Sequence, residues 1–305
     1  MKKEEKQVQC DDWLGICGIS AEEAEALRTP KKKIELYVFT DPLCPECWAF
    51  EPTLKKFIIE FGSYFSIRFF IASQLESRDS YDSKHKKNPK NLALRFEETA
   101  ARTGMSCDGD VWLENPLVSS YVPSLAIKAA EMQGRTKAAT FSRKLREKLF
   151  LEKQNVADEK VLYEIARATG LDENSFQSDF HSTCAIKALQ CDIKTTREME
   201  VDRAPTFVFF NEKIEEAGLK VPGSYPYEVY VDILTEMLGF TPKRADKLPL
   251  EDFLKKFQFV ASKEVAVVYD LSLKEAESCL KKLMLKRKVE RVPVKYGTFW
   301  KYLSS

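Results

Sequence analysis

Cys44 and Cys47, separated by two residues, are the pair in this chain whose spacing best suits chemistry. They follow the apolar run 34–39 and precede a segment with helical periodicity. A cysteine in the first turn of a helix lies beside unpaired backbone N–H groups and the positive end of the helix dipole, and both favour the thiolate. This order predicts a thioredoxin-like fold with a redox-capable pair, in which Cys44 is exposed and reactive and Cys47 is its shielded resolving partner.

Zinc binding is the other common use of a CxxC motif, and it needs a second such motif or a nearby Cys/His pair. The sequence has no second CxxC, and its two histidines, His85 and His181, stand apart from the motif. We therefore expect no metal and no cofactor at the motif. The other cysteines are scattered, and most are expected to be buried as small apolar side chains.

Cys10 and Cys17 are a separate and weaker pair near the N-terminus. Their spacing suits either a redox pair or part of a metal site. No histidine stands near them, so a complete zinc site is not predicted. An exposed tail with two incidental thiols is the alternative.

A proline far downstream supplies the second half of the predicted site. Ala204-Pro205-Thr206 opens the apolar run 207–210. Thioredoxin-like proteins place a cis-proline at this point, where the preceding residue presents an unpaired N–H and C=O that can capture an extended peptide beside the CxxC motif. We expect the cis form, although a trans proline at the start of an edge strand is the alternative. The candidate binding residues are Trp48, Ala204, Pro205 and Thr206.

Hydrophobic periodicity predicts the elements that position these residues. The apolar stripe from Phe50 to Phe61 predicts a helix kinked by Pro52, and the alternation in 65–71 predicts a strand, which completes a β-α-β unit. A helical block then separates this unit from a last strand at 214–221 and a closing helix at 227–238. The helices expected in the block span 92–102, 123–133, 136–153, 158–169 and 172–198.

This element order predicts the α/β class and, more narrowly, a DsbA-like thioredoxin domain over residues 32–240 with a helical insertion at about 91–199. A polar, proline-containing stretch at 239–249 predicts a linker, across which the charge changes. Residues 241–305 carry a net charge of +7, whereas residues 1–240 carry −6.

The C-terminal pattern predicts a small winged-helix domain over 249–305. Three helices are expected, followed by a β-hairpin, at 251–260, 264–269, 272–285, 289–294 and 298–302. The charge of this segment is modest, and Glu275 and Glu277 occupy the helix that would read a groove. Nucleic acid is therefore not an expected partner.

Length and composition indicate two domains of an ordinary soluble protein, with 305 residues, 44% hydrophobic and 31% charged. The N-terminal tail, residues 1–31, begins with charges of both signs and has no signal-peptide pattern, and no stretch approaches membrane-spanning length. We expect a cytoplasmic protein with no membrane partner, whose thiols are kept reduced.

Four motifs, together with the C-terminal pattern, resemble the SpxH (YjbH) adaptor family of low-GC Gram-positive bacteria. They lie at 41–48, 104–109, 189–192 and 218–225, and the resemblance runs from about residue 32 to the end. It implies a DsbA-like domain with a winged helix, and a cytosolic adaptor that binds the transcription regulator Spx and promotes its degradation by the ClpXP protease. Relatives can carry a His/Cys-rich, zinc-binding start, whereas this chain has Cys10 and Cys17 without histidine, so the resemblance does not imply zinc binding here.

Glu46, between the two cysteines, bears on whether the motif is catalytic. Its carboxylate is expected to disfavour the Cys44 thiolate and so to make the pair a weak oxidant. A binding protein that is not an enzyme is therefore the leading hypothesis. The alternatives are a cytosolic thiol-disulfide oxidoreductase in which Cys44 attacks and Cys47 resolves, and a DNA-binding redox regulator acting through residues 250–305.

Overall fold

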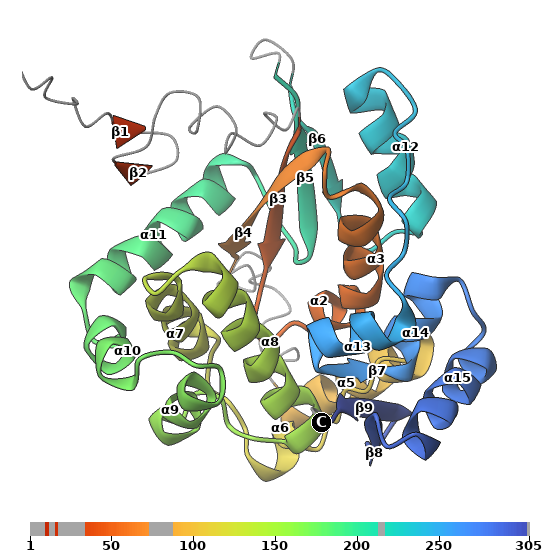
Figure 1. Ribbon diagram of the computed structural model, residues 1–305. Helices are drawn as coiled ribbons and strands as arrows, with labels where there is room; N and C mark the ends of the chain where they lie inside the picture. Colours follow the sequence, from red (N-terminus) through yellow and green to blue (C-terminus); the bar gives the residue numbers. More distant parts are fainter. Residues whose placement is uncertain (1–9, 12–15, 18–33, 73–87, 213–216, 304–305) are drawn as a thin grey trace, which may run out of the picture.

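The computed structural model describes residues 34–72, 88–212 and 217–303, together with two short strands, β1 (Cys10–Asp11) and β2 (Ile16–Cys17). β1 and β2 pair antiparallel, with the backbone of Cys10 opposite that of Cys17. The side chains of these two cysteines lie outside the described residues, so their candidate redox or metal role stays a prediction. Figure 1 shows a central sheet among helices, with a small second sheet near the C-terminus.

The central sheet has four strands in the order β4-β3-β5-β6. β3 (Ile34–Thr40) lies parallel to β4 (Phe65–Ile71) and antiparallel to β5 (Thr206–Phe210), which pairs antiparallel with β6 (Leu219–Pro222). A parallel pair needs a crossover connection, and the predicted β-α-β unit supplies it. The predicted strand at 214–221 lies partly outside the described residues, and β6 begins at Leu219.

Two consecutive helices form the crossover, where the sequence predicts one kinked helix. α2 (Pro45–Ala49) ends before Phe50, and α3 (Glu51–Phe61) begins directly after it. Pro52 lies in the first turn of α3, where its missing N–H costs nothing, so a new helix starts there instead of a kink. α12 (Tyr227–Leu238) packs beside α3, and the two helices share a buried apolar core with the sheet.

The helical insertion agrees with the predicted block apart from two details. The seven helices of the block are α5 (Pro89–Thr103), α6 (Val111–Glu114), α7 (Tyr121–Glu131), α8 (Arg135–Glu152), α9 (Glu159–Ala168), α10 (Glu173–Phe180) and α11 (Thr183–Glu198). α6 is not predicted, and the predicted helix 172–198 is two helices, because the Ser182 hydroxyl accepts the Ala185 N–H and caps a new start. No described helix is both long and apolar enough to cross a membrane.

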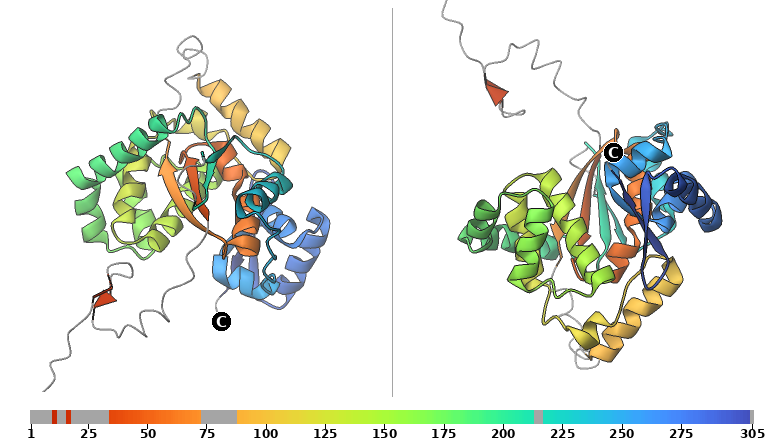
Figure 2. Two further views of the ribbon diagram at one scale, coloured as in Figure 1. Left: turned by 90° about the horizontal axis from the view of Figure 1, so that it is seen from above. Right: turned by 60° about the horizontal axis from the view of Figure 1, so that its bottom comes forward.

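The C-terminal segment has the element order expected of a winged helix. It comprises α13 (Leu250–Phe257), β7 (Phe259–Ala261), α14 (Ser262–Tyr269), α15 (Leu273–Leu285), β8 (Val289–Pro293) and β9 (Thr298–Tyr302), with the sheet order β7-β9-β8. The prediction that the first helix runs to 260 is wrong, because β7 pairs with β9 there. Figure 2 shows this segment and the helices α7–α11 on opposite sides of the central sheet.

The hairpin β8–β9 is docked on the helical insertion through Lys295. Its ammonium lies 2.9 Å from Glu97 Oε1, 3.0 Å from Asp108 Oδ1 and 2.8 Å from Asp110 Oδ2. The three carboxylates lie within 4.8 Å of one another, a grouping that could hold a metal ion, but here a lysine supplies the positive charge. The turn between β8 and β9 is therefore held against the insertion.

Lys295→Gln is expected to lower the free energy of unfolding by about 1–2 kcal/mol, because three clustered carboxylates lose the charge that compensates them. Chemical denaturation followed by tryptophan fluorescence measures the change. Lys301 is exposed on β9 and has no ion-pair partner among the described residues, so Lys301→Gln is the matched control. Equal effects of the two substitutions would contradict the docking role of Lys295.

Candidate functional site

The structure brings the CxxC motif and the downstream proline together, as the sequence predicts. The Cys44 thiol donates a hydrogen bond to the Ala204 carbonyl at 3.4 Å, and the Ala204-Pro205 peptide bond is cis. The antiparallel register of β3 and β5 places Thr206 opposite Phe39, so that the start of β5 meets the end of β3 that leads into the motif. Cys44 caps α2 and accepts the Cys47 N–H at 3.3 Å.

Burial decides which of the predicted site residues can touch a partner. Cys44 and Ala204 are partly exposed, whereas Cys47 is only 6% exposed, as expected of a shielded thiol. Trp48 and Thr206 are both 0% exposed, so neither side chain is accessible to a partner in this structure, and their binding role stays a prediction. The Pro205 ring is also buried. The accessible part of the site is therefore the Cys44 thiol with the Ala204 backbone.

Trp48 packs in the core, where it connects three parts of the chain. Its ring stacks between Phe150 of α8 and Phe299 of β9, with centroid distances of 5.5 and 6.1 Å. Its indole N–H donates to the Ser106 carbonyl at 2.8 Å, and the Arg143 guanidinium lies 4.4 Å above the ring. The side chain next to the motif thus fixes the C-terminal segment to the insertion.

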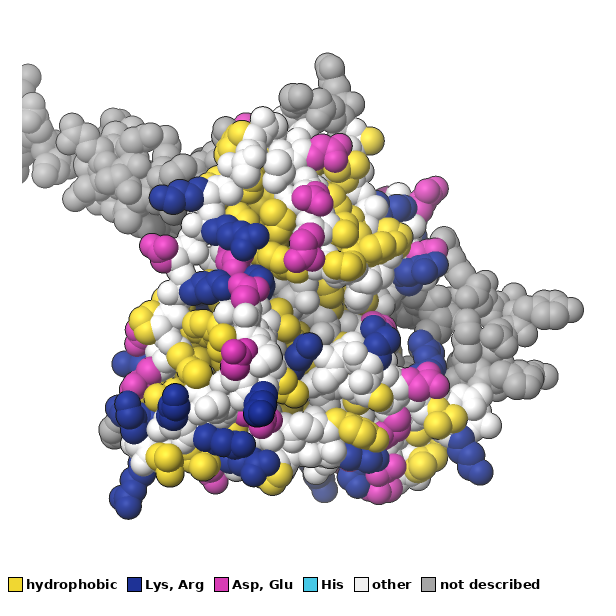
Figure 3. Space-filling view, turned by 90° about the vertical axis from the view of Figure 1, so that its right-hand side faces the viewer, with side chains coloured by type: hydrophobic (Ala, Val, Ile, Leu, Met, Phe, Trp, Pro, Cys, Tyr) yellow, Lys and Arg dark blue, Asp and Glu magenta, His cyan; other side chains and the backbone are white. Residues whose placement is uncertain are grey.

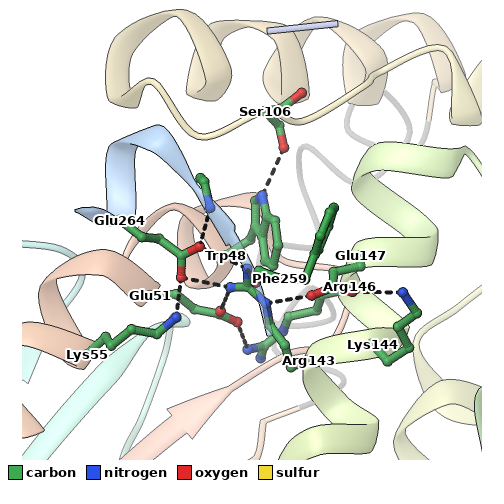
Figure 4. Close-up of polar contacts among 11 residues, drawn as sticks. Trp48, Glu51, Lys55, Ser106, Arg143, Lys144, Arg146, Glu147, Phe259 and Glu264 are labelled. Atoms are coloured by element: carbon green, nitrogen blue, oxygen red, sulfur yellow. Dashed lines mark hydrogen bonds and ion pairs between the residues drawn. The ribbon is translucent and has the colours of Figure 1, made fainter. Parts of the chain in front are cut away.

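A buried charge cluster lies behind the motif, between α3, α8 and α14 (Figure 4). Glu264 of α14 is 0% exposed, pairs with Lys55, and lies 3.0 Å from Arg143 Nη2. Burial alone would raise the pKa of this carboxyl, but the charges of Arg143 and Lys55 outweigh it and lower the pKa to about 2. Glu51 forms ion pairs with both Arg143 and Arg146, and its Oε1 lies 2.8 Å from Arg146 Nη1.

Arg146 extends this cluster to the thiols. It donates a hydrogen bond to the Thr40 hydroxyl at 2.6 Å. Burial opposes ionisation of Cys47, but the hydrogen bond with Cys44, the charge of Arg146 and the hydrogen bond with Thr40 lower its pKa. The same hydrogen bond with Cys47, together with burial, raises the pKa of Cys44 well above its usual range. Within the pair, the structure therefore keeps the proton on Cys44.

The expected role of Glu46 needs correction. The sequence predicts that this carboxylate disfavours the Cys44 thiolate; the pKa of Cys44 is indeed raised, but Cys47 and burial are the main causes. Glu46 instead accepts a hydrogen bond from Thr99 at 2.9 Å and pairs with Arg102 of α5. Its charge is thus compensated locally.

The remaining cysteines also differ from the expectation that most are buried. Among the described residues outside the motif, Cys107 is buried, Cys184 and Cys191 are exposed on α11, and Cys279 is intermediate. Burial raises the pKa of Cys107 strongly, so this thiol is inert at neutral pH.

Two of the sequence motifs support the site from behind. The loop 104–109 carries Ser106, whose hydroxyl accepts the Tyr296 N–H at 3.3 Å. In this loop a Cβ on Gly109 would lie 2.3 Å from the Ala93 carbonyl oxygen, so only glycine fits. The segment 218–225 holds the proline, since the Gly223 N–H donates to the Pro205 carbonyl at 2.7 Å.

Comparisons with known proteins agree with this geometry. A family model described as thioredoxin matches residues 37–232. A protein from Halalkalibacterium halodurans named ClpXP adapter protein SpxH is 53% identical over 305 residues, which cover 99% of this chain and 100% of that protein. One of the same name from Bacillus subtilis is 51% identical over 278 residues, which cover 90% and 91% of the two chains.

Among solved structures, a probable DsbA oxidoreductase from Streptomyces coelicolor matches with a TM-score of 0.54 at 16% identity, covering 71% of this chain and 92% of that one. At this identity the likeness concerns the fold alone. The predicted DsbA-like thioredoxin fold is confirmed.

Glu264→Gln is expected to destabilise the protein at neutral pH, because it leaves Arg143 and Lys55 short of a buried counter-charge. The folded-state pKa of about 2 lies below the ordinary 4.5, so the charged carboxylate contributes about 3 kcal/mol that is present above pH 4.5 and lost as the pH falls toward 2. Urea denaturation across this range should show the difference between wild type and variant closing. A constant difference would contradict the assignment.

Arg146→Met is expected to raise the pKa of Cys47, because a nearby positive charge is lost. Glu46→Gln should leave the pKa of Cys44 in place, since Arg102 already compensates Glu46. Thiolate absorbance during pH titration, compared with matched variants lacking Cys47 or Cys44, measures each value. Arg146→Lys, which keeps the charge, should restore the Cys47 value; a failure to restore it would point to packing instead.

Proposed function

Because the chain belongs to the SpxH family of ClpXP adapter proteins, we propose that it delivers the transcription regulator Spx to the ClpXP protease in the cytoplasm, by binding and not by catalysis. The observation that carries this proposal is the 53% identity to such an adapter across 99% of the chain. An adapter of this kind raises the share of client that the protease can engage, so no covalent bond needs to change on the adapter itself.

The state of the thiols supports binding over catalysis. Attack by a cysteine requires its thiolate, and here the partly exposed Cys44 is the thiol whose pKa is raised. The thiol with the lowered pKa, Cys47, is buried. A pair arranged in this way is a weak oxidant, and its accessible thiol is a slow nucleophile. It therefore suits a surface that binds a partner while both thiols remain reduced.

The contacts that the C-terminal segment makes with the rest of the chain also suit an adapter. The Glu264 cluster, the Trp48 stack and Lys295 hold the C-terminal segment against the thioredoxin domain. A client bound to one domain is therefore held in a fixed orientation relative to the other. We do not propose nucleic-acid binding, because Lys295 in the turn between β8 and β9 already pairs with acidic residues of the insertion.

Thiol-disulfide exchange is the second candidate function, and the intact geometry of the motif favours it. Cys44, Cys47 and the cis-proline stand together, so a mixed disulfide between Cys44 and a substrate could be resolved by Cys47. Reduction of insulin by the full-length protein, lost in Cys44→Ser, would support this activity. Its absence would leave the binding function alone.

The double variant Cys44→Ala/Cys47→Ala is expected to accelerate Spx degradation by purified ClpXP as well as wild type does, because the adapter acts by binding. The rate of Spx loss in the reconstituted reaction is the measurement, and Spx degradation without adapter is the baseline. A folded double variant with no acceleration would show that thiol chemistry is required and would contradict the proposal.

A further inference from the structure

The outward face of α12 carries a row of three carboxylates. Tyr230 and Leu234 pack inward against the sheet and α3, and both are buried. Glu228, Asp232 and Glu236 follow one another at four-residue spacing, so they lie in one row on the opposite side, and all three are exposed. The helix thus has a fully packed inner side and a uniformly acidic outer row.

The three carboxylates have no compensating partner within the described part of the chain. Many other acidic side chains form ion pairs, including those bound to Lys295 and Arg143, whereas no ion pair or side-chain hydrogen bond involves Glu228, Asp232 or Glu236. Like charges at four-residue spacing destabilise an isolated helix. The row therefore opposes folding slightly and is available to a partner of opposite charge.

Apolar side chains flank the acidic row. Val229, Ile233 and Met237 form the next row on the helix and are partly exposed, although Ile233 and Met237 also pack against the core shared with α3. Tyr225 and Phe240 are exposed at the two ends of the row. Figure 3 faces this side of the molecule: in its upper half, acidic side chains (magenta) stand next to hydrophobic ones (yellow), and Lys and Arg (dark blue) lie to either side of them. Charges next to apolar surface lose water on docking, which strengthens their pairing with a partner.

The start of α12 is linked to the thiol site through a short hydrogen-bonded turn. The Tyr230 hydroxyl accepts the Tyr225 N–H at 3.2 Å and lies 3.4 Å from the Gly223 carbonyl, and the Gly223 N–H in turn donates to the Pro205 carbonyl. A rigid turn of a few residues thus joins the proline beside Cys44 to the first turn of α12. A single bound protein could cover both regions.

We infer that the outward face of α12 is a docking surface for a basic, amphipathic helix of the client protein, Spx in the function proposed above, on which this inference rests. Lysine or arginine side chains at four-residue spacing would pair with Glu228, Asp232 and Glu236. Apolar side chains of the same helix would cover Val229, Ile233 and Met237. The surface recognises its partner by this combination of charge and apolar contact.

The test measures Spx affinity for the full-length chain and for the charge-reversal variant Glu228→Lys/Asp232→Lys/Glu236→Lys. The control is Glu164→Lys/Asp252→Lys/Glu290→Lys, in which three exposed carboxylates of α9, α13 and β8, unpaired among the described residues, give the same change in net charge. We expect the reversal to weaken binding at least about tenfold while the control stays within about twofold of wild type. Added salt should weaken wild-type binding and reduce the difference between wild type and reversal.

Each outcome has a distinct reading. Equal affinity of wild type, reversal and control would overturn the docking surface while leaving the adapter function in place. Equal weakening by reversal and control would also overturn it, because general charge would then explain the effect. If the wild-type chain itself fails to bind Spx, the proposed function falls, and this inference falls with it. The neutral variant Glu228→Gln/Asp232→Asn/Glu236→Gln, which relieves the repulsion in the helix, should still bind more weakly than wild type; undiminished binding would overturn the surface.

Discussion

A buried carboxylate constrains how the two parts of the molecule fit together. Glu264 is inaccessible to solvent, and a charge in that position is tolerated only where cations are held beside it. Lys55 comes from the helix behind the thiol motif, and Arg143 comes from the helical insertion. Because both partners belong to the thioredoxin domain, the C-terminal segment has one orientation in which its own charge is satisfied. The Trp48 stack and the Lys295 contacts then fit that orientation.

The same charge network extends to the thiols. Glu51 divides its two oxygens between Arg143 and Arg146, so the charge that lies near Cys47 and the charge that neutralises Glu264 belong to one network. The protonation of the motif and the docking of the C-terminal segment are therefore physically connected, although their residues lie far apart in the sequence. The fold thus places the redox pair beside a network of buried charges, and within the pair the proton stays on Cys44.

Local patterns predict most of the elements, whereas the meeting of the motif with the proline is predicted from the place of the cis-proline in thioredoxin-like proteins. The alternation in β4 and the stripe of α3 each reflect interactions within a few residues, which a sequence displays directly. Local patterns miss the break between α10 and α11, which depends on the cap at Ser182. They also miss the strand that begins at Phe259, which depends on pairing with the distant strand β9. Arg143 and Glu264 are separated by 121 residues, so no local pattern could join them.

Adjacent residues at the site also differ in their surroundings. Trp48 directly follows the motif in the chain, yet its side chain packs in the core. Glu46 adjoins Cys44 in the chain, but α2 turns its carboxylate toward α5. Adjacency in the sequence therefore does not indicate which charged groups lie close together in the fold.

The accessible cysteines of α11 have a practical consequence for work on this protein. Cys184 and Cys191 face solvent, whereas Cys47 and Cys107 are enclosed. Among the cysteines whose side chains the structure describes, thiol reagents will therefore react first on a helix that has no part in the CxxC pair. Only peptide-resolved labelling separates the oxidation history of the motif from that of its surroundings.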